Sequence, residues 1–221
     1  MSKFTFATEE GGFDSHIAKS IRGYEDLCDD VVKFSEYYAR ESYDIVDLGC
    51  STGRLLRRMK QQNKHVDCMY VGVENEPKFF DDLVEENKLC FYKTDAKSVI
   101  YNNLCFVTSI FTLQFIDPTD RFSILRNIYT GLISGGAFVI AEKTYSPDVR
   151  MQDMMTFMYY DYKKKSFTEK EILDKEVKLR SMLKLYTEEE LINELRSVGF
   201  SRIYPFWRNF NFVGYICHKD S

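Results

Sequence analysis

The sequence predicts a single α/β domain, residues 1–221, in which a mostly parallel sheet carries helices on both faces and ends in an antiparallel hairpin. Three observations lead to this prediction: short apolar runs alternate with polar segments of helical character, a glycine-rich turn follows the first run, and two further apolar runs close the chain. Runs that are apolar throughout suit strands covered on both faces, and strands that alternate with helices imply right-handed crossovers and parallel pairing. A chain of 221 residues, 44% of them hydrophobic, can bury one substantial core.

The predicted elements follow one another in the order that such a fold requires. The strand-like runs are residues 43–48, 69–74, 89–92, 104–110 and 137–141. A helix is expected to begin near Arg54, directly after the glycine-rich turn. The closing hairpin is predicted from residues 201–207 and 212–218, joined by Arg208 and Asn209. Ligands in such sheets bind beyond the carboxyl ends of the parallel strands.

Residues 151–186 differ from the rest of the chain because they are rich in Met, Tyr and Lys. We expect two helices here, inserted over the ligand cleft, and the three lysines at 163–165 are typical of a solvated helix face. A further helix is predicted over residues 187–198. Thr187 followed by three glutamates fits an N-cap with an acidic first turn, and Gly199 fits the end of a helix.

The composition argues against several classes of protein. The formal net charge of −4 argues against a surface that binds nucleic acid directly. The six cysteines lie far apart, with no C-x-x-C pair and no histidine spacing suited to zinc, so we expect reduced core residues and no metal site. No segment has the pattern of a signal peptide or the apolar length of a membrane span, so we expect a cytoplasmic protein without a membrane partner.

The segment from Asp47 to Gly53 has the pattern D-x-G-x-x-x-G, placed between a predicted strand and a predicted helix. Gly49 permits a tight turn, Ser51 lets a ligand approach the backbone closely, and Gly53 lets the helix pack against the strand. The spacing differs from the G-x-G-x-x-G of dinucleotide sites, whose pyrophosphate sits on a helix N-terminus, so no phosphate is expected here. Taken alone, the pattern is also compatible with a purely structural turn.

Two acidic residues at strand ends favour a ligand site over a structural turn. Glu74 ends the second apolar run, where a carboxylate can accept hydrogen bonds from both ribose hydroxyls. Asp95 follows the third run and can accept a hydrogen bond from the adenine amino group. Because both lie at the ends of consecutive strands beside the glycine-rich turn, we predict a nucleoside-binding site.

These residues resemble the class I S-adenosylmethionine-dependent methyltransferases, and the match covers most of the chain. A closer resemblance, to the carboxy-S-adenosylmethionine synthase family, rests on five segments whose order extends over almost the full length. They are residues 20–24 (SIRGY), 111–115 (FTLQF), 135–143 (GGA through EK), 180–183 (RSML) and 209–212 (NFNF). The resemblance implies a Rossmann-like methyltransferase fold and an S-adenosylmethionine-dependent transferase.

The resemblance also implies a reaction and a set of contacts. The carboxyl group of prephenate is transferred to the methyl carbon of S-adenosylmethionine through a sulfonium ylide, and the product serves wobble-uridine modification in tRNA. The implied contacts to S-adenosylmethionine or its carboxy derivative place Gly49, Cys50 and Ser51 at the methionine part, Glu74 and Asn75 at the ribose, Asp95 and Ala96 at the adenine, and Tyr24 and Arg180 at the sulfonium. Arg180 would pair with the added carboxylate, which a planar guanidinium holds through two hydrogen bonds.

The chain departs from the family pattern at the expected active site. Ile110, a cofactor-contact position, stands where the family has an asparagine. Glu74 replaces an aspartate, and Tyr159 and Tyr160 lie in a region where the family has histidines. Two other functions therefore stay open: a methyltransferase acting on a small molecule or RNA, and a catalytically silent S-adenosylmethionine-binding partner protein.

Two further interpretations concern the inserted helices. Arg180 is also compatible with a surface role, in which it pairs with Glu176 one helical turn away. The resemblance, together with the Met- and Tyr-rich residues 151–162, predicts a symmetric homodimer that buries apolar surface of the insertion.

Overall fold

The computed structural model describes residues 12–220 and arranges eight strands of them in one mixed sheet, in the order β3-β2-β1-β4-β5-β8-β7, with β6 paired to β5. The strands are β1 (Asp44–Leu48), β2 (Met69–Glu74), β3 (Leu89–Lys93), β4 (Leu104–Ile110), β5 (Leu132–Tyr145), β6 (Tyr186–Thr187), β7 (Arg202–Asn209) and β8 (Phe212–His218). Strands β1 to β6 pair in parallel, whereas β8 runs antiparallel to both β5 and β7. The predicted fold class, a mostly parallel Rossmann-like sheet closed by an antiparallel hairpin, is confirmed.

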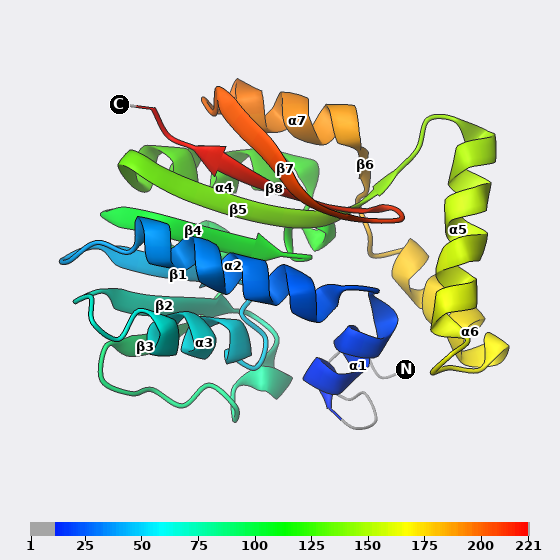
Figure 1. Ribbon diagram of the computed structural model, residues 1–221, viewed down its shortest axis with the longest axis horizontal. Coiled ribbons are helices and arrows are strands. Elements are labelled where there is room, and N and C mark those ends of the chain that lie inside the picture. The colour runs from blue at the N-terminus through cyan, green and yellow to red at the C-terminus, as the bar shows by residue number, and fades with distance from the viewer. Residues whose placement is uncertain (1–11, 221) are drawn as a thin grey trace.

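Helices cover both faces of the sheet (Figure 1). On one face, α2 (Tyr24–Tyr38) and α3 (Arg54–Gln62) bury Leu27, Leu56 and Met59 completely. On the other, α4 (Pro118–Gly131) and α7 (Glu188–Ser197) bury Ile124 and Leu195 completely. The sheet is therefore sandwiched between two apolar layers, which explains why its central strands are apolar throughout.

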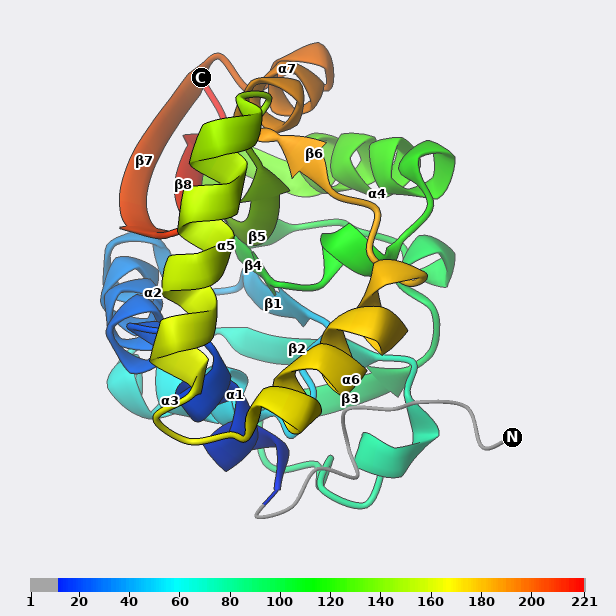
Figure 2. The same ribbon diagram turned by 90° about the vertical axis from the view of Figure 1, so that its right-hand side faces the viewer.

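The remaining helices gather at one end of the sheet. Helices α1 (Phe13–Ser20), α5 (Val149–Lys163) and α6 (Glu169–Arg180) lie beyond the carboxyl ends of the parallel strands (Figures 1 and 2). Short 3-10 turns follow β2, β3 and β4: η2 (Pro77–Phe79), η3 (Ala96–Ser98) and η4 (Leu113–Phe115). The two predicted inserted helices are confirmed as α5 and α6, although Tyr186, the last residue assigned to the insertion, belongs to β6.

Local sequence explains where α7 begins and ends. The Thr187 hydroxyl accepts a hydrogen bond from the Glu190 amide, and the Glu190 side chain accepts from the Thr187 amide, which together form a capping box. Gly199 follows the helix with a φ of 126°. The predicted helix and both of its end signals are confirmed, and α3 begins at Arg54 as expected.

Two predicted boundaries are corrected. The hairpin turn is Phe210–Asn211 and not Arg208–Asn209, because Asn209 pairs with Phe212 in the β7–β8 ladder. A two-residue hairpin turn requires positive φ, and Phe210 adopts 49° there, beneath the guanidinium of Arg22, which lies 5.6 Å from the ring centroid. Strand β5 is also longer than residues 137–141. It begins earlier, at Leu132, across a register shift against β4, and it continues past Ala141 because it pairs there with β8 and β6.

Five of the six cysteines are buried and Cys90 is half-buried, and all six are free thiols, in agreement with their prediction as reduced residues. Within the described part of the chain, none of the helices combines the length and the apolar character needed to span a membrane.

Candidate functional site

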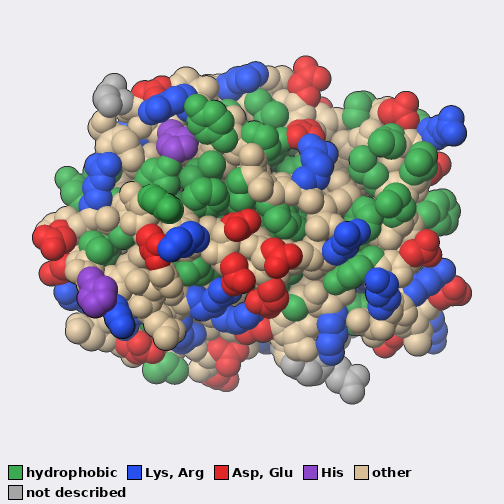
Figure 3. All heavy atoms as spheres, viewed as in Figure 1, with side chains coloured by type: hydrophobic (Ala, Val, Ile, Leu, Met, Phe, Trp, Pro, Cys, Tyr) green, Lys and Arg blue, Asp and Glu red, His purple; other side chains and the backbone are tan. Residues whose placement is uncertain are grey.

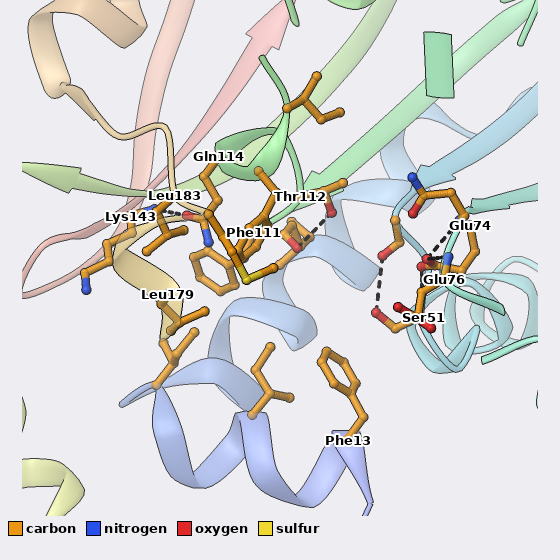
Figure 4. Close-up of a pocket in the computed structure, with 18 of the residues that line it drawn as sticks. Phe13, Ser51, Glu74, Glu76, Phe111, Thr112, Gln114, Lys143, Leu179 and Leu183 are labelled. Carbon is orange, nitrogen blue, oxygen red and sulfur yellow. Dashed lines mark hydrogen bonds between the residues drawn. The ribbon is translucent and has the colours of Figure 1, made fainter. Parts of the chain in front are cut away.

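A cavity of about 470 Å³ lies at the carboxyl ends of the parallel strands, beneath α1 and α6 (Figure 4). It lies where β1 is flanked by β2 on one side and β4 on the other, so successive crossovers leave toward opposite edges of the sheet. Open α/β sheets bind their ligands at this switch point. A volume between roughly 300 and 1,000 Å³ is usual for small-molecule sites, so the cavity has the size of such a site.

The glycine-rich turn forms the floor of the cavity next to β1. Gly49 has a φ of 68°, and a Cβ on it would lie 2.3 Å from Oγ1 of Thr112, which donates a hydrogen bond to the Leu48 carbonyl. Only glycine therefore fits at this position. Gly53 has a φ of 74°, and a Cβ on it would lie 3.0 Å from the Phe91 ring, so the predicted roles of both glycines in turn and packing geometry are confirmed.

Glu74 lies at the acidic end of the cavity and accepts three hydrogen bonds from backbone amides. Its Oε2 accepts a hydrogen bond from the Ser51 amide at 2.9 Å, and its Oε1 accepts from the amides of Asn75 and Glu76 at 2.9 and 2.8 Å. Burial raises the pKa of Glu74, while these three amides act in the opposite direction. A carboxylate has about four acceptor positions, so about one remains for a hydroxyl group in the cavity.

The other residues predicted at the nucleoside line the same end. Asn75, Asp95 and Ala96 all border the cavity. Asp95 caps η3 by accepting a hydrogen bond from the Lys97 amide at 3.0 Å, and this contact holds its carboxylate at the end of β3. Apolar side chains of Phe79 and Ala96 border the same space and provide flat or small surfaces suited to a purine ring. The structure thus brings together the residues that the sequence assigned to ribose and adenine.

A smaller hollow adjoins the glycine-rich turn and contains Tyr24, Asp47 and Cys50, with Ile110 on the border that it shares with the main cavity. Asp47 is buried and accepts a hydrogen bond from Oγ1 of Thr108 at 2.7 Å, and burial raises its pKa to about 7. Burial likewise raises the pKa of the Tyr24 hydroxyl. Tyr24, Asp47 and Cys50 therefore lie beside the glycine-rich turn and outside the lining of the main cavity. Their predicted contacts with a ligand stay predictions.

Arg180 does not lie at the cavity. It is the last residue of α6, its side chain is exposed, and it is absent from the cavity lining. The alternative prediction, that Arg180 pairs with Glu176, is wrong. No ion pair joins these two side chains, and the Glu176 carboxylate faces Lys143 and Lys163. The contact between Arg180 and a carboxylated ligand therefore stays a prediction.

Two lysines occupy the end of the cavity opposite Glu74. Lys143 lies on β5 and Lys163 on α5, and their ammonium groups lie 3.7 and 4.0 Å from oxygens of Glu176. The Tyr159 ring lies between them, with its centroid 5.4 Å from the Lys143 nitrogen and 5.1 Å from that of Lys163. The cavity is thus acidic at the nucleoside end and basic at the other (Figure 4).

Sequence analysis missed this basic end. The run 163–165 was interpreted as a solvated helix face. Lys164 and Lys165 are exposed but lie in the turn after α5, and the interpretation is wrong for Lys163, which ends α5 with a side chain that is 3% exposed. Lys163 follows Tyr159 by four residues, so both lie on the same face of α5. That spacing was the available signal.

No group of three or more His, Cys, Asp or Glu side chains arranged to hold a metal ion lies within residues 12–220.

Comparisons with known proteins agree with this geometry. Residues 46–140 match the family described as methyltransferase domain. A carboxy-S-adenosyl-L-methionine synthase from Staphylococcus epidermidis is 30% identical over 98% of this chain and 97% of its own length, and one from Shewanella halifaxensis is 29% identical over 99% and 94%.

Solved structures show the same fold at low identity. An O-methyltransferase family protein from Burkholderia thailandensis is 14% identical, with a TM-score of 0.65 over 98% of this chain and 62% of that one. Human N-acetylserotonin methyltransferase is 13% identical, with a TM-score of 0.56 over 94% and 65%. From the full-length similarity to the curated relatives, we conclude that this chain belongs to the carboxy-S-adenosyl-L-methionine synthase family of S-adenosylmethionine-dependent transferases.

Proposed function

We propose that this protein converts S-adenosylmethionine and prephenate to carboxy-S-adenosylmethionine and phenylpyruvate. The observation that carries the proposal is that one cavity is lined both by Glu74, at the nucleoside end, and by Ile110 and Phe111. The relatives that match nearly the whole chain are named for this product. We further propose that the product serves as the carboxymethyl donor for wobble-uridine modification in tRNA.

The residues of the acidic end fit S-adenosylmethionine. The backbone at Gly49 borders the cavity without a side chain of its own, and Glu74 presents a buried acceptor at the end of β2. Bound S-adenosylmethionine would supply the methyl carbon that accepts the carboxyl group. In this proposal Glu74 and Asn75 orient the ribose, Asp95 and Ala96 flank the adenine, and the turn from Gly49 to Ser51 holds the methionine part.

The proposed reaction balances without a further reagent. A carbon–carbon bond breaks in prephenate and a new one forms to the methyl carbon, while the hydroxyl group that prephenate loses takes up the methyl proton and leaves as water. The protein has to hold both reactants together and exclude bulk water, since positioning alone lowers the barrier substantially. The helices α1 and α6 cover the cavity and suit this task.

Purified protein incubated with S-adenosylmethionine and prephenate is expected to yield carboxy-S-adenosylmethionine and phenylpyruvate in equal amounts. Mass spectrometry of the nucleosides and absorbance of phenylpyruvate measure the two products. Reactions without prephenate and without S-adenosylmethionine are the controls. S-adenosylhomocysteine in place of the carboxylated product would favour the methyltransferase alternative, and tight binding without turnover would favour a silent partner protein.

We also propose that the protein is a homodimer formed through α5. Apolar side chains gather over this helix on the surface (Figure 3), and the exposed ones are Val149, Met151, Met154, Phe157 and Met158. Phe157 is 67% exposed and Val149 is 75% exposed. An apolar helix face of this kind is unusual on a monomer and suits a self-complementary contact about a twofold axis.

Light scattering and sedimentation of the wild-type protein are expected to give the mass of two chains. Phe157→Asp is expected to give the mass of one chain, because it places a charge in the apolar contact. Asp153→Asn, on the same helix, serves as a control for a change of charge. A wild-type protein that stays monomeric at high concentration would rule out the dimer.

A further inference from the structure

The ammonium group of Lys143 has donors to spare inside the cavity. Its side chain is only 15% exposed, and its nitrogen lies 3.7 Å from the Glu176 carboxylate, beyond hydrogen-bonding distance. Among the described residues, no acceptor forms a hydrogen bond with this nitrogen, whose other neighbours are the Tyr159 and Phe212 rings. An ammonium group offers three donors, and a largely buried one that keeps its charge needs an acceptor.

Among residues 12–220, the one carboxylate near the Lys143 ammonium, that of Glu176, lies 3.7 Å away and also faces Lys163. It therefore leaves the hydrogen-bond donors of Lys143 unused. An anion that accepts hydrogen bonds from this ammonium would satisfy them. Such an anion can reach Lys143 because the residue lines the cavity.

Gln114 adds a second donor. Its Oε1 accepts a hydrogen bond from the Lys143 backbone amide at 2.7 Å, so its amide nitrogen remains as a donor at the cavity wall. Apolar surfaces of Phe111, Leu179 and Phe212 border the same region. The site therefore fits a small anion that carries an apolar ring.

The geometry points to Lys143, supported by Lys163 and Gln114, as the subsite for the carboxylate that the donor substrate keeps through the reaction. This assignment rests on the proposed function in identifying the donor as prephenate, which has one carboxylate that is lost and one that stays in phenylpyruvate. An ammonium bound to the departing carboxylate would stabilise its charge and slow its loss as neutral carbon dioxide. The retained carboxylate gains from the same contact in substrate and product alike.

The test compares Lys143→Met with Lys143→Arg, and with Lys164→Met, which removes an exposed charge in the turn after α5, outside the cavity. The KM for prephenate is measured by turnover, and the Kd for phenylpyruvate by calorimetry in the presence of S-adenosylmethionine. Lys143→Met is expected to raise both constants by roughly 10- to 150-fold, the effect of one charge-assisted hydrogen bond. Affinity for S-adenosylmethionine should change less than about twofold, Lys143→Arg should recover part of the loss, and Lys164→Met should resemble the wild type.

Changes of less than about twofold in both constants for Lys143→Met would overturn the assignment, as would an equal loss of affinity for S-adenosylmethionine. A rise of the prephenate KM in Arg180→Met but not in Lys143→Met would transfer the subsite to Arg180. Lys143→Gln, which keeps a polar side chain, replaces the methionine variant if circular dichroism shows that the latter is unfolded. Absence of carboxylated product from the wild type contradicts the proposed function alone, because phenylpyruvate binding still tests the anion subsite.

Discussion

Replacing Arg121 by methionine is expected to lower the free energy of unfolding by about 3 to 5 kcal/mol, the usual cost of removing one partner from a buried ion pair. The Arg121 side chain is 2% exposed, its Nε lies 2.8 Å from Glu194, and its guanidinium lies 4.3 Å from the centroid of the Tyr186 ring. Glu142 lies 3.9 Å away and is equally buried. Without the guanidinium, two buried carboxylates would lose their counter-ion.

The loss should depend on pH. Burial already raises the pKa of Glu142 to about 8 although Arg121 acts to lower it, and burial also raises the pKa of Glu194. Removing Arg121 raises the pKa values of Glu142 and Glu194 in the folded protein further. At pH values above the ordinary glutamate pKa, the folded variant therefore binds more protons than the unfolded chain does. Stability then falls as pH rises, and the difference from wild type should be larger at pH 8.5 than at pH 5.5.

Urea unfolding at the two pH values measures this effect. Arg126→Met, an exposed arginine on the same helix, is the matched control and should change stability little. Adding Glu142→Gln and Glu194→Gln to Arg121→Met should recover part of the loss, since it removes the unpaired charges. A loss that is equal at both pH values would contradict this electrostatic account.

Replacing Glu74 by glutamine is expected to weaken S-adenosylmethionine binding by about 1.5 to 3 kcal/mol, or roughly 10- to 150-fold. The carboxylate is the buried acceptor that we assign to the ribose, and a neutral amide accepts hydrogen bonds more weakly. Calorimetry measures the affinity. Glu85→Gln, exposed before β3, is the control for the loss of one negative charge.

Glu74 also accepts hydrogen bonds from the amides of Ser51, Asn75 and Glu76, so its replacement could act by disturbing the turn. Two further ligands distinguish this effect from the loss of a direct contact between Glu74 and the ribose. Wild-type protein should bind adenosine more tightly than 2′,3′-dideoxyadenosine, and Glu74→Gln should reduce this preference. If the variant loses affinity for both ligands equally, Glu74 shapes the turn without touching the ribose. Unchanged affinity would refute the cofactor-site assignment.

The nucleoside end of the cavity could be predicted because its residues follow strand ends. Glu74 closes β2 and Asp95 follows β3, and parallel pairing of neighbouring strands brings such positions together whatever the helices do. The turn at Gly49 was equally predictable, since a tight turn between a strand and a helix favours glycine, and its φ is 68°. Arg180 had no such constraint, because its place depends on how α6 packs over the sheet.

Local interactions, then, determined much of this protein from its sequence alone. The alternation of apolar runs with helical segments specified the sheet, and the capping box of Thr187 and Glu190 specified the start of α7, because each acts within a few residues of chain. Tertiary packing decided the rest. It moved the hairpin turn to Phe210, and it buried Lys163 beside Tyr159 while leaving Lys164 in solvent. It also brought Lys143 from β5 to Glu176 of α6, since a contact between side chains 33 positions apart depends on how the elements dock, which no short-range pattern encodes.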